Sequence, residues 1–291
     1  MLTGSIVALV TPMNQDGGID REAWRRLLDR HDRAGTHGVV VAGTTGESPT
    51  IGEDEYADLL AIAVERLGGR LAVIAGTGNA STAQTIARTH LAAGLGADSA
   101  LVVTPPYNRP PQRGLEAHFR AVADASDIPI ILYNVPGRTS VDLLPETSLK
   151  LAGHPGIIGI KEAVGDAERV RLLVTGGMNV LSGDDPTCCQ RMLDEGANGV
   201  ISVAANVVPE AMVRLCDHAR AGRPDQALAE HQRLEALFEF LSAEANPLPV
   251  KWLLHQTGWI GPALRLPLVE LDEQFHARGR ELMEQLSLEV V

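Results

Sequence analysis

Short apolar segments and amphipathic segments alternate eight times along the chain, and this repetition restricts the fold more than any single motif does. The apolar segments are continuously apolar, which is typical of strands that are buried on both faces of a parallel sheet. They occupy residues 6–10, 38–42, 71–75, 99–103, 129–133, 157–161, 180–183 and 199–203. The spacing leaves room for one helix between each strand and the next.

An amphipathic segment follows each apolar segment, and its apolar residues recur at the period of a helix. These segments occupy residues 20–34, 53–67, 82–93, 115–125, 145–152, 167–174, 186–195 and 209–219. Eight pairs of strand and helix predict a closed (β/α)8 TIM barrel of the α/β class. An open doubly wound sheet also alternates strands with helices, but eight regular units without a mononucleotide fingerprint favour the closed barrel.

After Gly222 the pattern changes to three helical segments, at residues 225–243, 249–256 and 270–286, which are separated by prolines. A barrel of about 250 residues with an appendage accounts for a chain of 291 residues. We therefore expect two parts: a catalytic (β/α)8 barrel over residues 1–222 and a C-terminal helical subdomain over residues 223–291.

The composition and charge of the chain restrict its partners and its location. The hydrophobic content of 45% is ordinary for a soluble globular protein, and no apolar run reaches the roughly 20 residues of a membrane span. A net charge of -12 argues against nucleic acid or an anionic membrane as a partner, because both require a basic patch. The chain begins without a basic leader, so we expect a cytoplasmic protein. Three cysteines, with Cys188 next to Cys189, are expected to be buried thiols.

Lys161 ends the apolar segment at residues 157–161, and it is one of only three lysines in a chain with 25 basic residues. An amine at the mouth of an apolar barrel loses hydration, which favours its neutral, nucleophilic form. Such a lysine can attack a carbonyl group and form a Schiff base. A lysine at a strand end can also extend its charge into water, and the spacing alone does not separate the two interpretations.

Other candidate residues lie at the ends of predicted strands, where barrel enzymes place their catalytic groups. Thr44 and Thr45 belong to a run of small residues that suits either a carboxylate-binding loop or a tight turn. Tyr107 and Tyr133 are two of three tyrosines, and a phenol near a reactive lysine can pass protons, although tyrosine at a strand end is also ordinary packing. Arg138 lies in a loop with Gly and Pro and offers two parallel donors to a substrate carboxylate.

Two adjacent aspartates, Asp184 and Asp185, follow the seventh predicted strand. They can be interpreted as a metal site or as caps of the helix that Pro186 opens, and we favour capping. The run at residues 76–78 is too short for a dinucleotide loop, and the sequence has neither a Gly-x-x-x-x-Gly-Lys phosphate loop nor a His-Glu-x-x-His pair. The sequence therefore predicts chemistry that uses no metal and no nucleotide.

Three motifs together resemble the dihydrodipicolinate synthase family, whose members are also called 4-hydroxy-tetrahydrodipicolinate synthases. They are residues 43–47, 133–139 and 159–162, and the resemblance runs from Thr3 to about Pro267. The family belongs to the class I aldolases of a superfamily that also contains N-acetylneuraminate lyase and keto-deoxy sugar-acid aldolases. The resemblance implies that Lys161 forms the Schiff base with pyruvate, that Thr44, Tyr107 and Tyr133 relay protons, with Tyr107 reaching into a neighbouring subunit, that Thr45 holds the pyruvate carboxylate, that Arg138 holds the carboxylate of aspartate semialdehyde, and that Gly183 and Ile201 line the site.

The resemblance implies a lyase that condenses pyruvate with L-aspartate 4-semialdehyde in the diaminopimelate and lysine biosynthesis pathway. It implies no cofactor beyond the covalent imine on Lys161, and a homotetramer built as a dimer of dimers. The alternative is an aldolase or lyase of the same superfamily that acts on N-acetylneuraminate or a keto-deoxy sugar acid. Arg138 favours the synthase, because sugar-acid enzymes generally lack an arginine at the matching place. A third reading, an inactive binding protein on the same barrel, would require a broken site.

The chain departs from the family where lysine-sensitive bacterial members bind lysine as a feedback inhibitor at a subunit interface. The matching positions carry Ser48, Tyr56, Ala80, Gln84 and Pro106, with Asn79 one place off. These changes remove a carboxylate and a phenol that would bind the ammonium groups of lysine. We therefore predict that lysine inhibits this protein weakly or not at all.

Overall fold

Eight parallel strands form a closed barrel in the computed structural model, which describes residues 2–288 and 290. β1 pairs with β2 on one side and with β8 on the other, so the ring closes without an open strand edge. The strands are β1 (Gly4–Ala8), β2 (Gly38–Val41), β3 (Ala72–Gly76), β4 (Ser99–Val103), β5 (Ile130–Asn134), β6 (Ile157–Glu162), β7 (Val180–Ser182) and β8 (Gly199–Ser202). The predicted (β/α)8 barrel is therefore confirmed.

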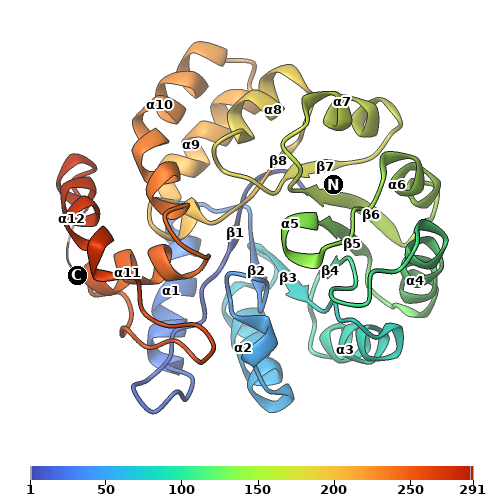
Figure 1. Ribbon diagram of the computed structural model, residues 1–291, viewed down its shortest axis with the longest axis horizontal. Coiled ribbons are helices and arrows are strands. Elements are labelled where there is room, and N and C mark those ends of the chain that lie inside the picture. The colour runs from blue at the N-terminus through green and yellow to red at the C-terminus, as the bar shows by residue number, and fades with distance from the viewer. Residues whose placement is uncertain (1, 289, 291) are drawn as a thin grey trace.

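Helices surround the barrel, and Figure 1 shows them as a ring around the strands. They are α1 (Arg21–Ala34), α2 (Glu53–Leu67), α3 (Thr82–Gly94), α4 (Gln112–Ala125), α5 (Pro136–Thr139), α6 (Pro145–Ala152), α7 (Ala167–Thr175), α8 (Cys188–Asp194) and α9 (Pro209–Arg220). Two short 3-10 turns, η1 (Ser48–Thr50) and η2 (Ala204–Asn206), follow β2 and β8. The single turn α5, which the sequence pattern did not predict, lies inside the ring near the ends of β5 and β6 (Figure 1).

The side chains of the strands divide between two apolar layers, because successive residues of a strand point to opposite faces of the sheet. One layer fills the barrel interior and consists of Ile6, Ala8, Val40, Ile74, Leu101, Ile131, Tyr133, Leu181 and Ile201. The other layer packs outward against the helices, including Trp24 and Leu27 of α1. Burial on both faces explains why the apolar segments of the sequence are continuous.

Three element boundaries differ from the sequence-based prediction. β1 ends at Ala8 rather than at residue 10, because the Val10 N–H donates to the side chain of Asn206 instead of to a neighbouring strand. α8 begins at Cys188 rather than at residue 186, and the Cys188 N–H closes a turn on the Asp185 carbonyl. The last tail helix begins at His276 rather than at residue 270, because a separate 3-10 turn precedes it.

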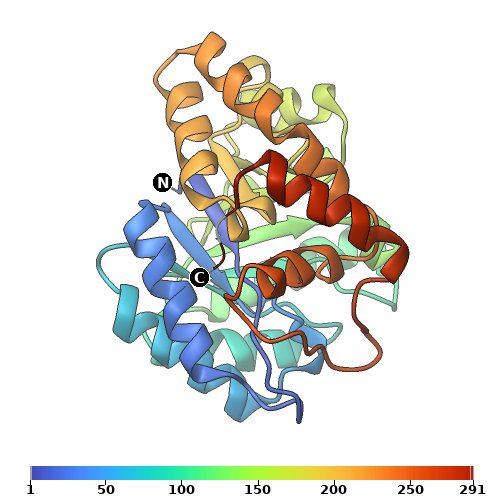
Figure 2. The same cartoon turned by 90° about the vertical axis from the view of Figure 1, so that its left-hand side faces the viewer.

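Three helices follow the barrel: α10 (Pro224–Leu241), α11 (Leu248–Gln256) and, after the turn η3 (Glu273–Phe275), α12 (His276–Gln285). α10 packs against α9 and α8, and α11 contacts η2 at the end of β8. Figure 1 shows the three helices on one side of the ring, and Figure 2 brings them to the front. Within residues 2–288, no helix is both long and apolar enough to cross a membrane.

Candidate active site

Lys161 projects from β6 into the mouth of the barrel, beside Tyr133 of β5. The parallel register pairs Tyr133 with Lys161, which places both side chains on the interior face of the sheet. Lys161 is only 5% exposed, and its Nζ lies 4.5 Å from the centroid of the Tyr133 ring. The side chain is therefore held in the barrel and does not extend into water, so the structure favours the reactive lysine over the snorkelling one.

A cavity of about 200 Å³ lies over Lys161. Its lining includes six of the residues that the sequence nominated, namely Thr44, Thr45, Tyr133, Arg138, Lys161 and Gly183. They come from the loops that follow β2, β5, β6 and β7, so the strands bring together residues that lie far apart in the sequence. The barrel therefore assembles hydroxyls, an amine and a guanidinium around one small space.

Two nominated residues lie outside the lining of this cavity. Ile201 of β8 is buried in the interior layer of the barrel together with Tyr133. Tyr107 follows β4, has a backbone φ of +74° and is 93% exposed on this chain. An exposed phenol held in the left-handed region suits a residue that functions outside its own subunit, which stays a prediction for this chain.

Asn246, which the sequence analysis missed, brings the C-terminal helices to the cavity. It lies between α10 and α11, and its Nδ2 donates to the Thr45 hydroxyl over 3.0 Å. Its backbone carbonyl accepts a bond of 3.4 Å from Arg138 Nη2. No local pattern marks this asparagine, because its position depends on how the tail folds back over the barrel.

The loop after β2 is held by a buried ion pair rather than by its turn alone. Glu47 and Lys251 of α11 are almost fully buried, and Lys251 Nζ lies 2.6 Å from Glu47 Oε1. Lys251 Nζ also donates to the carbonyls of Thr11 and Ala263. Because Thr44 and Thr45 lie directly before Glu47, the tail fixes the loop that carries them.

The expected capping by Asp184 and Asp185 is wrong for Asp185. The structure gives α8 no side-chain cap, and the Asp185 carboxylate instead accepts from the N–H groups of Val203 and Ala204, at 2.9 and 2.8 Å. Burial raises the pKa of Asp185. This carboxylate therefore ties the loop after β7 to the turn after β8, where two amides are available and α8 has not yet begun.

Gly183 is required by the close approach of the strands at this end of the barrel. A Cβ at this position would lie 2.9 Å from Ala163 Cβ and 3.1 Å from the Glu162 carbonyl oxygen. The Gly183 N–H donates to the same carbonyl over 2.8 Å. A side chain at residue 183 would therefore displace the segment that follows Lys161.

Cysteine and metal chemistry were tested on the part of the chain that the structure describes. All three cysteines are buried and free, as predicted, and burial raises the pKa of the Cys189 thiol to about 11. Among residues 2–288 and 290, no group of three or more His, Cys, Asp or Glu side chains is arranged to hold a metal ion.

The sequence matches the model of the Dihydrodipicolinate synthetase family over residues 1–286. The chain belongs to this family. A 4-hydroxy-tetrahydrodipicolinate synthase of Xanthomonas axonopodis pv. citri is 51% identical over 294 residues, which cover 100% of this chain and 97% of that protein. The resemblance seen in the three sequence motifs is confirmed.

Solved structures of the family superpose on almost the whole chain. The pyruvate complex of the chloride-inhibited dihydrodipicolinate synthase of Acinetobacter baumannii has a TM-score of 0.97 and 44% identity, and it covers 99% of this chain and 100% of its own. A dihydrodipicolinate synthase variant described as monomeric has a TM-score of 0.96 and 38% identity, covering 99% and 97%. These relatives are lyases of the class I aldolase type, so the predicted enzyme class is confirmed for the family to which this chain belongs.

The predicted departure from lysine-sensitive family members can be placed in the structure. Tyr56 of α2 is fully buried, and the Arg88 guanidinium lies 4.0 Å from the centroid of its ring. Gln84 of α3 is exposed and uncharged. An arginine beside Tyr56 adds positive charge next to a region where a lysine ligand would bring two ammonium groups.

Proposed function

We propose that this chain condenses pyruvate with L-aspartate 4-semialdehyde through a Schiff base on Lys161. The observation that carries the proposal is the buried Lys161 amine, which lies against the Tyr133 ring under a cavity lined by Thr44, Thr45 and Arg138. The relatives that are about half identical over the whole chain are named for this synthase activity.

In the proposed first step, the neutral Lys161 amine attacks the pyruvate keto carbon, a C–N bond forms, and water leaves. The protonated imine withdraws electrons from the pyruvate methyl group, which loses a proton to give an enamine. The enamine carbon then attacks the aldehyde carbon. The amine of the second substrate finally displaces Lys161 by transimination, which closes the ring and regenerates the enzyme.

Hydroxyl groups move the protons that these steps require. Thr44 and Tyr133 line the cavity, and a phenol both donates and accepts hydrogen bonds. We propose that Tyr107 of a second copy of this chain completes the relay to solvent. Lys161 itself supplies the electron-withdrawing imine, so the proposed reaction needs no cofactor.

Each substrate carboxylate has its own proposed partner. Thr45, whose hydroxyl is already oriented by Asn246, is placed to bind the carboxylate of pyruvate. Arg138 is exposed at the rim and offers paired donors to the carboxylate of aspartate semialdehyde. Gly183 and Ile201 are proposed to shape the space around the bound intermediate.

We further propose that the active assembly is a homotetramer, a dimer of dimers, located in the cytoplasm, where its two small metabolites are made. Residues 1–222 would form the catalytic barrel, and residues 223–291 a helical subdomain that supports it through Asn246 and Lys251. The outward position of Tyr107 supports at least a dimer.

Borohydride reduction in the presence of pyruvate tests the mechanism. The reduced adduct should appear by peptide mass spectrometry on the peptide that contains Lys161, and Lys161→Ala should abolish it. Lys251→Ala is a poor control because that residue is buried in an ion pair, whereas Lys150→Ala removes an exposed lysine and should leave the adduct unchanged. An adduct on another residue would refute the assignment.

A further inference from the structure

The residues that follow Tyr133 and Lys161 lie on the opposite face of the same two strands. The register pairs Asn134 of β5 with Glu162 of β6, one position beyond the pair that faces the cavity. Alternation along each strand sends the side chains of Asn134 and Glu162 outward, between the sheet and the helices. Both are fully buried there.

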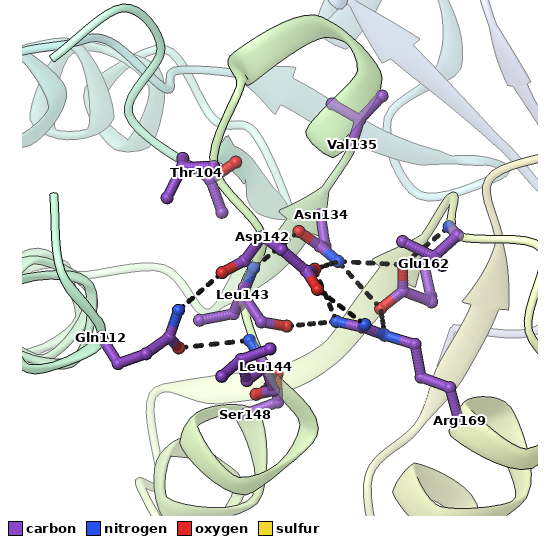
Figure 3. Close-up of polar contacts among 12 residues, drawn as sticks. Thr104, Gln112, Asn134, Val135, Asp142, Leu143, Leu144, Ser148, Glu162 and Arg169 are labelled. Carbon is purple, nitrogen blue, oxygen red and sulfur yellow. Dashed lines mark hydrogen bonds and ion pairs between the residues drawn. The ribbon is translucent and has the colours of Figure 1, made fainter. Parts of the chain in front are cut away.

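Arg169 of α7 joins these two residues to Asp142 in a buried polar network, which Figure 3 shows. The Arg169 Nε donates to Glu162 over 2.9 Å, and its Nη1 and Nη2 donate to Asp142 over 2.9 and 2.7 Å. The Asn134 amide donates to Asp142 over 2.8 Å and to both Glu162 oxygens. One guanidinium thus satisfies two carboxylates, and Arg169 is only 8% exposed.

The network closes the loop that carries Arg138. Residues 135–141 lie between Asn134 and Asp142, and the side chain of Asn134 accepts from the Leu143 N–H over 2.9 Å. Arg169 also donates to the Leu143 carbonyl. Both ends of the loop are therefore bound to one side-chain cluster, which is anchored to the strand that holds Lys161.

The middle of the loop is held by hydroxyls rather than by charges. Thr104 at the end of β4 donates to the Thr139 hydroxyl over 3.1 Å, and the Thr139 hydroxyl bonds within the loop to the Val135 and Val141 carbonyls. Arg138 itself makes one long bond to the Asn246 carbonyl. The direction of its guanidinium is therefore set by where the two loop ends are held.

We infer that Arg169 is a positioning residue that holds the Arg138 loop in place for the second substrate, acting through Asp142, Asn134 and Glu162. This inference rests on the proposed function, because it assigns Arg138 to the carboxylate of aspartate semialdehyde. The loop has no bond from this network to the pyruvate side of the cavity, where Thr45 is held by Asn246. Loss of the clamp should weaken the second substrate and spare the first.

Two variants break the clamp in different ways. Arg169→Met keeps an unbranched side chain of similar length but removes every donor. Glu162→Gln/Arg169→Met breaks the same bonds without leaving Glu162 charged and unpaired, so it remains folded if the charge imbalance alone unfolds the single variant. Steady-state kinetics with each substrate, borohydride trapping with pyruvate, and circular dichroism are measured for both.

We expect the KM for aspartate semialdehyde to rise about tenfold or more in both variants, whereas the KM for pyruvate and the yield of trapped adduct stay within about twofold of wild type. A second measurement repeats Arg169→Met in the Arg138→Ala background. There the further loss in kcat/KM should fall below about twofold, because a residue that acts through Arg138 has nothing left to position.

Three results would overturn the inference: unchanged kinetics in a folded variant, equal losses for both substrates, or unfolding of both variants, which would make the network a stability element only. The wild-type chain in the same assay separates this inference from the proposed function. If wild type does not condense the two substrates, the proposed function is wrong. If wild type does so and the variants match it, the function stands and the clamp is refuted.

Discussion

Lys251→Met is expected to destabilise the protein more than any exposed lysine substitution. Lys251 lies in α11 with 1% exposure, and its three donors bond to Glu47 and to the carbonyls of Thr11 and Ala263. Burial lowers the pKa of Lys251, while the Glu47 carboxylate opposes that effect. Methionine matches the length of the side chain, so the variant chiefly removes the charge and its hydrogen bonds.

The size of the effect follows from what the variant leaves behind. Glu47 would remain as a buried carboxylate without its cation, and removing one partner of a buried ion pair costs about 3–5 kcal/mol. For a large domain, 1 kcal/mol lowers Tm by about 2–4 °C, so Tm should fall by roughly 10 °C. The loop with Thr44 and Thr45 would also loosen, which should raise the KM for pyruvate.

Equilibrium unfolding in urea at matched protein concentration measures the change in free energy of unfolding. Lys150→Met is the matched control, because Lys150 is exposed and lies 3.8 Å from Glu116, and it should change stability by less than about 0.5 kcal/mol. Glu47→Gln/Lys251→Met should recover most of the loss, since no unpaired charge is then buried. A loss below about 1 kcal/mol for Lys251→Met would refute the reasoning.

Four further predictions follow from the site. Arg138→Ala should lower kcat/KM for aspartate semialdehyde by about a hundredfold or more while pyruvate trapping persists, and little loss would favour the sugar-acid lyase alternative. Tyr107→Phe should be nearly inactive, but mixed oligomers with Lys161→Ala chains should regain activity, since one subunit then supplies an intact amine and the other an intact phenol; no recovery would place the phenol in its own subunit. Lysine should inhibit with a constant above about 1 mM, as measured by initial rates, because the matching positions lack a carboxylate for its ammonium groups. Burial raises the pKa of Glu162, and Arg169 opposes this, so Arg169→Met should raise that pKa further; the folded variant then holds the proton more tightly, and its Tm deficit relative to wild type should widen from about pH 5 to about pH 8, whereas a constant deficit would contradict the assignment.

Several features of this chain are local enough to be predicted from the sequence. The eight apolar segments predicted the strands because burial on both faces requires continuous apolarity, and the closed barrel confirmed them. The barrel rule then directed attention to strand ends, where Thr44, Tyr133, Arg138 and Lys161 were found and where the structure gathers them in one cavity. Prolines and capping residues located most helix ends to within a few residues.

Other features depend on contacts between segments far apart in the chain. Asn246 reaches Thr45 across 201 positions and Lys251 reaches Glu47 across 204, and neither pairing has a periodic pattern that a sequence displays. The shift of Asp185 from the expected helix cap to the amides after β8 has the same origin, because a carboxylate bonds to whichever donors the fold brings near.

The sequence by itself therefore determined the barrel and the chemical groups at its mouth, since periodicity and strand-end position are properties of neighbouring residues. Only the tertiary structure decided which groups hold them in place: the tail over the Thr45 loop, and the Arg169 network beneath the Arg138 loop. Buried charges and amides must find partners wherever the chain packs, and that choice is made in three dimensions.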